Sequence, residues 1–224
     1  MNYVIASTKV WHENLTLQLS DSNEQEFFLI NSKDSLNFDC LTKIEPKYIF
    51  FPHWSFIIPQ EIYQNFECVI FHMTDVPFGR GGSPLQNLIA RGIYETKITA
   101  LKCEAELDAG PVYLKRPLSL YGTAEEIYIR ASKIIEEMIA EIVLHEPIPV
   151  PQQGGVTCFQ RRQPKDSDIS ELTELEKVFD YIRMLDADGY PNAFLETDYF
   201  RLEFQRPALK HGKIVADVII TKKE

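Results

Sequence analysis

Short, continuously apolar segments recur through the first third of the chain and alternate with stretches that suit helices. Each of these apolar segments is four or five residues long. Buried strands of a parallel sheet have this length and composition, because helices cover both of their faces. The pattern predicts strands over Tyr3–Ala6, Glu26–Ile30, Lys47–Phe51 and Cys68–His72, and helices over Trp11–Leu19 and Leu36–Ile44.

Capping residues mark two further helices. One is predicted over Ser83–Arg91, because a Ser-Pro pair begins it and a glycine directly follows it. The clearer one begins at a capping box of Thr123 and Glu126, and an apolar stripe at helical spacing follows to Ile142. Two strands are predicted between these helices, over Ile98–Cys103 and Pro111–Arg116.

The composition changes at the proline- and glycine-rich segment Pro147–Gly155, which we take as a domain boundary. Beyond it the pattern favours a helix over Glu171–Leu185. Two strands follow, over Tyr199–Gln205 and Ile214–Thr221, and a short turn joins them as a hairpin.

These elements predict an α/β fold in two parts. Residues 1–150 form a Rossmann-like, mostly parallel sheet with helices on both faces, and residues 151–224 form a small helix and β-hairpin appendage. The first part carries 12 basic and 20 acidic residues, and the second carries 11 and 13. Because phosphate backbones and anionic membranes require a cationic surface, this balance argues against nucleic-acid and membrane partners.

The four cysteines lie far apart, among apolar or strand-forming residues. Without a CxxC pair they are typical of buried, reduced thiols. The N-terminus lacks the basic and long apolar regions of a signal peptide, and no apolar run approaches 18 residues. We therefore expect a cytoplasmic protein without a metal site or a membrane span.

The segment His72–Pro84 carries the clearest candidate chemistry. It follows a predicted strand, is rich in glycine, and contains an imidazole, a carboxylate and a guanidinium. Ligands of open parallel sheets bind where strands end in loops, and glycine lets the backbone approach a ligand. The alternative interpretation is an ordinary glycine-rich turn with a solvated Arg80.

Two other segments carry weaker signals. Asp108 lies in the turn Glu106–Pro111, where a single acidic residue is commonly just a turn residue. The aromatic and apolar loop Pro52–Pro59 could line a ligand pocket or simply pack in the core.

The glycine-rich segment resembles the central motif of the folate-dependent formyltransferase family. That motif runs Asn-x-His-x-Ser-x-Leu-Pro-x-Tyr-Arg-Gly with a proline three residues later, and residues 70–84 read IFHMTDVPFGRGGSP. The family's second motif, Leu-Asp-x-Gly after a strand, is matched by Leu107, Asp108 and Gly110. The resemblance covers roughly residues 45–160, with both motifs in the family's order.

Two positions depart from the family's pattern. Gly79 replaces the motif's tyrosine, which reshapes the loop. Ile70 stands where the family has its catalytic asparagine, and its hydrocarbon side chain cannot donate a hydrogen bond to an oxyanion. Either another donor replaces it, with His53 and Ser55 as candidates on the neighbouring loop, or the activity is altered or lost.

The resemblance implies transfer of a formyl group from 10-formyltetrahydrofolate to an amine. Negative charge develops on the formyl oxygen, so the site needs a donor there and a group that takes the amine proton. We expect His72 to stabilise that charge or relay the proton. We expect Asp108 to orient His72 and to favour its protonated form.

The resemblance also implies binding residues. The expected folate-binding residues are Trp54, Ser55, Phe56, Ile57 and Ile58. The expected acceptor-binding residues are Lys9, Thr74, Arg80, Gly81 and Gly82. Lys9 lies in the turn Ala6–Trp11, which resembles the first loop of sugar nucleotide formyltransferases, and the Arg80 guanidinium could contact a phosphate.

The family includes enzymes that act on methionyl-tRNA, glycinamide ribonucleotide and nucleotide-linked amino sugars. The net charge of residues 151–224 argues against tRNA. We therefore expect a nucleotide-linked amino sugar as the acceptor, in glycan biosynthesis. The alternatives are a glycinamide ribonucleotide-type enzyme and a degenerate module that only binds folate or a nucleotide. The family often forms dimers, which allows a homodimer, but no segment identifies an interface.

Overall fold

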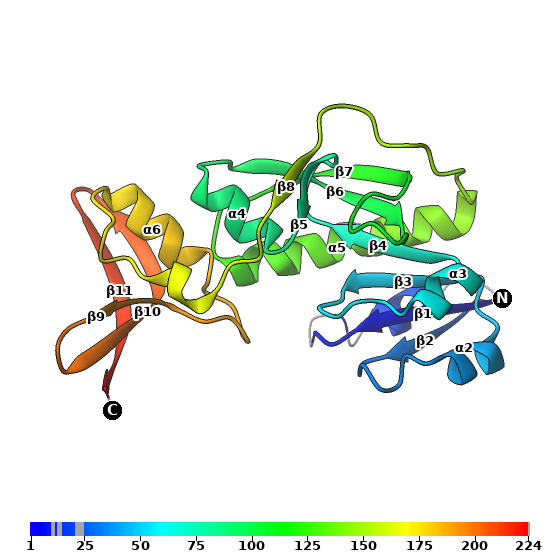
Figure 1. Ribbon diagram of the computed structural model, residues 1–224, viewed down its shortest axis with the longest axis horizontal. Coiled ribbons are helices and arrows are strands. Elements are labelled where there is room, and N and C mark those ends of the chain that lie inside the picture. Colours follow the sequence, from blue (N-terminus) through cyan, green and yellow to red (C-terminus); the bar gives the residue numbers. More distant parts are fainter. Residues whose placement is uncertain (10–11, 13–14, 21–24, 224) are drawn as a thin grey trace. The chain divides into compact units, whose positions relative to one another are not determined.

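The fold is described by a computed structural model, which covers residues 1–9, 12, 15–20 and 25–223 (Figure 1). The chain forms two compact units, each built from three separate segments. The first unit contains residues 1–80, 97–118 and 129–158, and the second contains residues 81–96, 119–128 and 159–224. The division predicted at residue 150, into a larger first part and a small appendage, stays a prediction.

A six-stranded sheet in the order β2-β1-β3-β4-β6-β7 forms the centre of the first unit (Figure 1). The first four of these strands pair in parallel, and β6 runs antiparallel to β4. This arrangement confirms the predicted α/β fold with a mostly parallel sheet. The strands are β1 (Asn2–Ser7), β2 (Glu26–Ile30), β3 (Tyr48–His53), β4 (Cys68–His72), β6 (Glu95–Lys102) and β7 (Val112–Ser119).

Helices connect the parallel strands, as the alternation of segments predicts. Part of the helix predicted over Trp11–Leu19 is present as α1, while residues 11, 13 and 14 lie outside the described residues. The helices are α1 (Leu15–Ser20), α2 (Phe38–Ile44), α3 (Gln60–Asn65), α4 (Pro84–Ala90), α5 (Ala124–His145) and α6 (Leu175–Arg183).

Successive residues of β3 enter two different cores, as the two-residue period of a strand requires. Ile49 and Phe51 pack in a cluster that contains residues of α2 and α3. The alternate residues Tyr48 and Phe50 point to the other side and stack with ring centroids 5.6 Å apart. A strand that is buried on both faces needs a continuous apolar run, which explains the pattern of the sequence.

The starts of α4 and α5 are capped differently. Before α5, the Thr123 backbone N–H donates to Glu126 Oε2 at 2.8 Å, and the Glu126 N–H donates to Thr123 Oγ1 at 3.4 Å. This confirms the predicted capping box. Before α4, Ser83 makes no side-chain cap, because its Oγ accepts from the backbone N–H of Arg162 at 3.1 Å. Ser83 thus occupies the predicted N-cap position, but its side chain does not cap the helix.

A small two-stranded sheet joins β5 (Phe78–Gly81) to β8 (Thr157–Phe159), and the sequence pattern did not predict it. The Thr157 N–H donates to the Pro77 carbonyl oxygen at 3.1 Å beside this pairing. Both strands are too short, and β5 too rich in glycine, to show the alternation that marks a strand. The pairing fixes the path of the loop that follows β4.

The second unit contains α4, α6 and a three-stranded antiparallel sheet in the order β11-β10-β9 (Figure 1). Arg183 and Asp180 form a buried ion pair with a 2.7 Å contact, and Arg183 also donates to the carbonyl oxygens of Leu120 and Gly122. The predicted helix and hairpin are present, and β9 adds a third strand. The strands are β9 (Ala193–Glu196), β10 (Phe200–Lys210) and β11 (Lys213–Lys222), and a 3₁₀ turn covers Pro164–Ser167.

The cysteines follow the predicted pattern in part. Cys68 and Cys103 are buried, and burial raises the pKa of the Cys103 thiol to about 11. Cys158 is exposed on β8, so the prediction of burial is wrong there. No helix in the described part of the chain is both long and apolar enough to cross a membrane.

Candidate active site

His72, the last residue of β4, is 7 % exposed at the carboxyl edge of the sheet. Its Nε2 lies 2.8 Å from the Gly79 carbonyl oxygen, and its Nδ1 lies 3.5 Å from Oδ2 of Asp108. The second distance is that of an ion pair rather than a hydrogen bond. Both ring nitrogens therefore face oxygen atoms. The structure thus brings the two predicted catalytic side chains together.

Asp108 lies in a turn between β6 and β7 that needs its particular residues. Its φ is 53°, in the left-handed region that aspartate and asparagine tolerate better than most residues. A Cβ at Gly110 would lie 1.9 Å from the Lys102 carbonyl oxygen, so only glycine fits there. The Leu-Asp-x-Gly motif therefore builds the turn that directs the carboxylate toward His72.

Gln152 holds this turn, and sequence reasoning missed it. Its Nε2 donates to the carbonyl oxygens of Asp108 at 2.8 Å and Gly110 at 2.9 Å. Its Oε1 accepts from Arg80, at 3.1 Å from Nε and 2.9 Å from Nη2. One amide thus links the loop after β4 to the turn that carries Asp108. Gln152 lies in the segment taken as a boundary, where composition gives no indication of a partner.

Arg80 is more enclosed than a solvated surface arginine, with its side chain 12 % exposed. Besides its contacts with Gln152, its Nη1 donates to Glu106 Oε1 at 3.1 Å. The guanidinium therefore organises the glycine-rich loop from within the protein. Its predicted contact with a phosphate stays a prediction.

Thr74 is fully buried in the loop after β4. Its Oγ1 donates to the Gly79 carbonyl oxygen at 3.3 Å, the same oxygen that faces His72, and its own carbonyl accepts from Thr99 Oγ1 at 2.7 Å. Thr74 thus shapes the loop around the imidazole. Its predicted contact with an acceptor stays a prediction.

Gly81 and Gly82 belong to the second unit, where they lie against the last residue of β8 and the chain just after it. A Cβ at Gly81 would lie 2.4 Å from the Phe159 carbonyl oxygen, and one at Gly82 would lie 2.6 Å from the Cβ of Arg161. This close backbone approach explains both glycines without a ligand. Their predicted role in acceptor binding stays a prediction.

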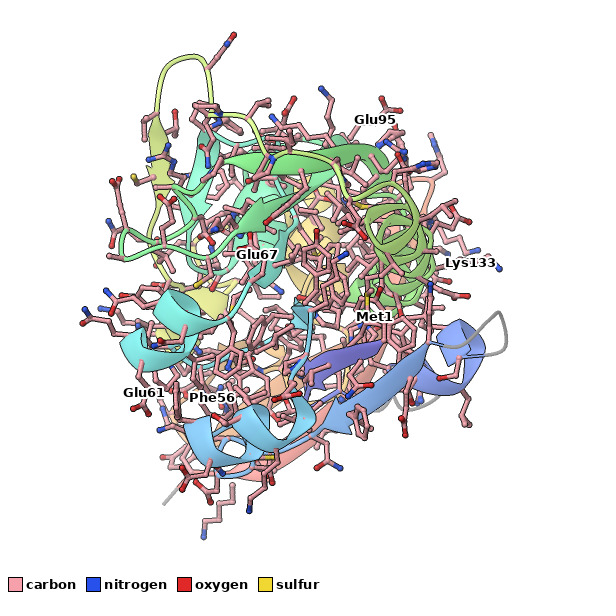
Figure 2. The ribbon with its side chains drawn as sticks, turned by 90° about the vertical axis from the view of Figure 1, so that its right-hand side faces the viewer. Met1, Phe56, Glu61, Glu67, Glu95 and Lys133 are labelled. Carbon is pink, nitrogen blue, oxygen red and sulfur yellow. The ribbon has the colours of Figure 1, made fainter. Side chains whose placement is uncertain are left out.

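The loop after β3 presents an aromatic and apolar surface. Phe56 and Ile57 are 42 % and 79 % exposed, whereas Ile58 is buried in the core cluster. Trp54 packs edge to face on Phe56 with ring centroids 5.4 Å apart. Figure 2 marks Phe56 in this loop and Glu61 on α3, which follows it.

The Trp54 indole also carries an unused polar group. Its Nε1–H is buried and has no hydrogen-bond partner among the described residues. Buried donors are normally paired, so a lone one beside exposed apolar rings suits a flat ring system that brings an acceptor. Ser55 is exposed in the same loop. These residues fit the predicted folate pocket, which stays a prediction.

A second polar cluster lies at the carboxyl ends of β1 and β3. Ser7 Oγ lies 2.8 Å from Nδ1 of His12, and the two residues are 2 % and 1 % exposed. His53, the last residue of β3, pairs in register with Ser7. Burial lowers the pKa of His12 to about 3, and burial together with the charge of Lys9 lowers that of His53 to about 4. Both imidazoles are therefore neutral at neutral pH.

This cluster lies at the point in the sheet where the order of the strands reverses. The chain leaves β1 toward β2 on one side and reaches β3 on the other, so the strand order reverses between β1 and β3. Ligands of open α/β sheets bind at such a switch point. Lys9 lies there, half-buried, while residues 10 and 11 of its predicted loop lie outside the described residues.

Ile70 lies two residues before His72 on β4 and packs against the core cluster of the first unit. Its side chain supplies neither a donor nor an acceptor to the site. Within the described part of the chain, no three histidine, cysteine, aspartate or glutamate side chains are grouped to hold a metal ion. An imidazole beside a carboxylate, as at His72 and Asp108, can move protons and stabilise negative charge.

Known formyltransferases share this chain's fold, but their sequence identity to it differs greatly. The structure of methionyl-tRNA formyltransferase from Clostridium thermocellum is 53 % identical and superposes with a TM-score of 0.97 over 100 % of both chains. Residues 164–221 match the family model for the C-terminal domain of methionyl-tRNA formyltransferase. A 4-N formyltransferase from Francisella tularensis has a TM-score of 0.69 over 96 % of both chains, but its 11 % identity shows the fold alone.

A curated relative is a methionyl-tRNA formyltransferase from Sinorhizobium medicae. It is 29 % identical over 154 residues, which are 65 % of this chain and 49 % of that protein. The chain thus spans about half the length of this relative. The sheet, the His72–Asp108 pair and these likenesses define the fold class of the folate-dependent formyltransferases. Within that class, the chain belongs to the methionyl-tRNA formyltransferase family.

This membership corrects the predicted acceptor. A nucleotide-linked amino sugar and a place in glycan biosynthesis are wrong, because the relative at 53 % identity and the matched C-terminal domain are those of methionyl-tRNA formyltransferases. The glycinamide ribonucleotide-type enzyme and the degenerate binding module do not fit either.

The exclusion of a nucleic-acid partner was wrong for a physical reason. The net charge of the 74 residues after residue 150 averages over segments of different composition. Residues 200–223 of that segment hold six lysine and arginine residues and only two acidic ones. Phosphate binding depends on such local groups rather than on the average charge of a domain.

Proposed function

We propose that this chain transfers a formyl group from 10-formyltetrahydrofolate to the amino group of methionyl-tRNA. The observation that carries the proposal is the His72–Asp108 pair at the carboxyl edge of the sheet, in a chain of this family. In the reaction, the amine nitrogen bonds to the formyl carbon and the bond between that carbon and N10 of the folate breaks. One proton passes from the amine to N10, so the products are formylmethionyl-tRNA and tetrahydrofolate.

His72 is the group best suited to the charge that develops on the formyl oxygen. Its Nε2 donates to the Gly79 carbonyl oxygen here, and the same N–H would have to exchange this acceptor for the formyl oxygen when the substrate binds. The carboxylate of Asp108 stabilises a positive imidazole and fixes its orientation. Gln152 holds the turn of Asp108, so the pair is set before the substrates arrive.

The folate donor finds suitable groups in the loop after β3. The rings of Trp54 and Phe56 offer apolar area, and the unpaired Trp54 N–H offers a donor for the edge of a heterocycle. The folate supplies the formyl group, and these residues orient it. Ser55, Ile57 and Ile58 complete the same segment, with Ile58 as its anchor in the core.

The β10–β11 hairpin supports a polyanionic acceptor. Lys210, His211 and Lys213 are exposed at its tip, and neither lysine has an ion-pair partner among the described residues. By contrast, Arg206 further along β10 is paired with Asp217. Uncompensated cations on an exposed turn suit contact with a phosphate backbone. Charging of tRNA takes place in the cytoplasm, so the proposal includes a cytoplasmic location.

The direct test incubates the purified chain with 10-formyltetrahydrofolate and charged methionyl-tRNA, and measures N-formylmethionine after deacylation. We expect formylation that requires the protein and both substrates. Uncharged tRNA and free methionine are the controls, and we expect neither to be formylated at a comparable rate. Formylmethionine no faster than in the absence of protein contradicts the proposal.

A further inference from the structure

The proposed reaction needs hydrogen-bond donors at the formyl oxygen, and β4 offers only part of what is needed. His72 closes the strand, but two residues earlier Ile70 presents a hydrocarbon that packs into the core cluster. Removal of one such donor from an acyl-transfer site lowers the rate by about 100- to 1,000-fold. A second donor is therefore expected from an element beside β4.

The neighbouring strand β3 ends at a side chain of the right chemistry. β3 and β4 pair in parallel with Phe51 opposite Ile70. Past this pair, β3 ends at His53 and β4 ends at His72. Parallel neighbours lie roughly 5 Å apart, so the two strand ends reach the same part of the sheet edge.

The local backbone singles out His53. The pairing of β3 with β1 shifts register between Ile5 and Ser7, which brings His53 opposite Ser7. Bulges of this kind redirect side chains and are common beside active sites. Ser55, the other candidate on this segment, is exposed to solvent, whereas His53 is only partly exposed. A donor works best where water is largely excluded, which favours His53 over Ser55.

The surroundings of His53 keep its imidazole neutral. Burial, together with the charge of Lys9, lowers the pKa of His53, and burial, together with His53, lowers the pKa of His12. A neutral imidazole carries one N–H donor and one acceptor nitrogen. Such a group can donate to an oxyanion without giving up its proton, since it does not titrate near neutral pH.

We propose that the His53 side chain donates a hydrogen bond to the formyl oxygen and so replaces the donor that Ile70 cannot provide. This inference rests on the proposed formyl transfer and adds a catalytic residue to it. It also resolves the choice between His53 and Ser55 that the sequence left open.

Ligand binding tests the inference without the acceptor. Calorimetry compares 10-formyl-5,8-dideazafolate with 5,8-dideazafolate on the full chain. We expect the wild type to bind the formylated compound about fivefold more tightly, as one hydrogen bond supplies, and His53→Ala to lose this preference. An unchanged preference in His53→Ala overturns the inference, as does the absence of a preference in the wild type. Failure of the wild type to bind either compound overturns the proposed function and the inference with it.

Kinetic rescue separates a donor from a structural residue. We expect His53→Ala to lower kcat for methionyl-tRNA formylation about 100-fold, with little change in KM for the folate. Introducing Ile70→Asn into His53→Ala restores an amide donor on β4 and is expected to recover at least about tenfold in kcat. His145→Ala, which removes an exposed histidine at the end of α5, is the matched control and keeps wild-type rates.

These outcomes test the role of His53 separately from the proposed formylation of methionyl-tRNA. A wild type that formylates methionyl-tRNA while His53→Ala is equally active overturns the inference and leaves the proposed function intact. Loss of activity in His53→Ala that Ile70→Asn does not restore, with a lowered unfolding temperature, also overturns it, because His53 is then only structural. A wild type that is inactive with methionyl-tRNA contradicts the proposed function, and the binding comparison then decides the inference.

Discussion

Nδ1 of His72 lies 3.5 Å from Oδ2 of Asp108, and the two side chains are each 8 % exposed. The imidazole comes from the end of β4, whereas the carboxylate comes from a turn in the left-handed conformation that Gln152 holds by two hydrogen bonds. The pair is therefore positioned by backbone geometry and by a third residue. Its alignment before substrate binding is the physical basis of the proposed catalysis.

Replacement of Asp108 by asparagine isolates the charge of this pair. Asparagine tolerates the φ of 53° at this position, so Asp108→Asn is expected to fold like the wild type. Loss of the carboxylate is expected to lower kcat/KM about 100-fold or more, as for other acid–base partners. Initial formylation rates and thermal unfolding of the same samples measure both effects. Asp34→Asn on the surface is the control, and a rate within about threefold of wild type for Asp108→Asn contradicts the role.

The amide of Gln152 is expected to act as a positioning group. Gln152→Glu keeps an acceptor for Arg80 but loses both hydrogen bonds to the turn, and Gln152→Ala loses every contact. We expect both variants to lower kcat about tenfold, because a misplaced catalytic group reduces rate more than affinity. The KM for the folate is expected to change little. Gln153→Ala, at the exposed neighbouring position, is the matched control. Wild-type kcat in Gln152→Glu excludes the positioning role.

The hairpin tip is expected to contact the tRNA. We expect Lys210→Gln combined with Lys213→Gln to raise KM for methionyl-tRNA by about tenfold and to reduce the salt dependence of log KM by roughly one to two units of slope, because two phosphate contacts are lost. The KM for the folate is expected to stay the same. Lys43→Gln removes an exposed lysine from α2 and serves as the control. An unchanged salt dependence in the double variant excludes these lysines from tRNA binding.

The buried histidines predict how stability depends on pH. In the folded state the pKa of His12 is lowered to about 3 by burial, so between that value and about 6.5 the unfolded chain binds more protons at this residue. The free energy of unfolding therefore falls as the pH is lowered through about 6.5, by about 1.4 kcal/mol for each pH unit that one such histidine contributes. Urea unfolding at pH 7.5 and pH 5 measures the change. We expect His12→Gln to show a smaller pH dependence, and an equal dependence contradicts the assignment.

The sequence predicted the fold of the first unit closely because its strands are buried on both faces. The ranges Glu26–Ile30 and Cys68–His72 were predicted without error, since a strand covered by helices shows as a continuous apolar run. The short pair β5 and β8 was missed, since neither strand has an apolar pattern of its own. Their pairing depends on the surrounding fold rather than on local preference.

The candidate site was predictable only where a motif carried it. His72 and Asp108 were found through the two motifs, and the structure brings them together. Gln152 acts through contacts to carbonyl oxygens of distant residues, which leave no pattern in a single sequence. The acceptor was predicted wrongly because the net charge of a segment does not report where its cations lie. The homodimer stays a prediction.

A single-turnover experiment tests whether His72 catalyses formyl transfer to methionyl-tRNA. In a single turnover with excess protein, [¹⁴C]formyl-tetrahydrofolate and methionyl-tRNA are mixed and labelled formylmethionyl-tRNA is followed over time, for the wild type and for His72→Ala. We predict that the wild type transfers the label and that His72→Ala does so at a rate at least about 100-fold lower, with both proteins folded. Absence of label on methionyl-tRNA with the wild type, or equal rates for the two proteins, would contradict it.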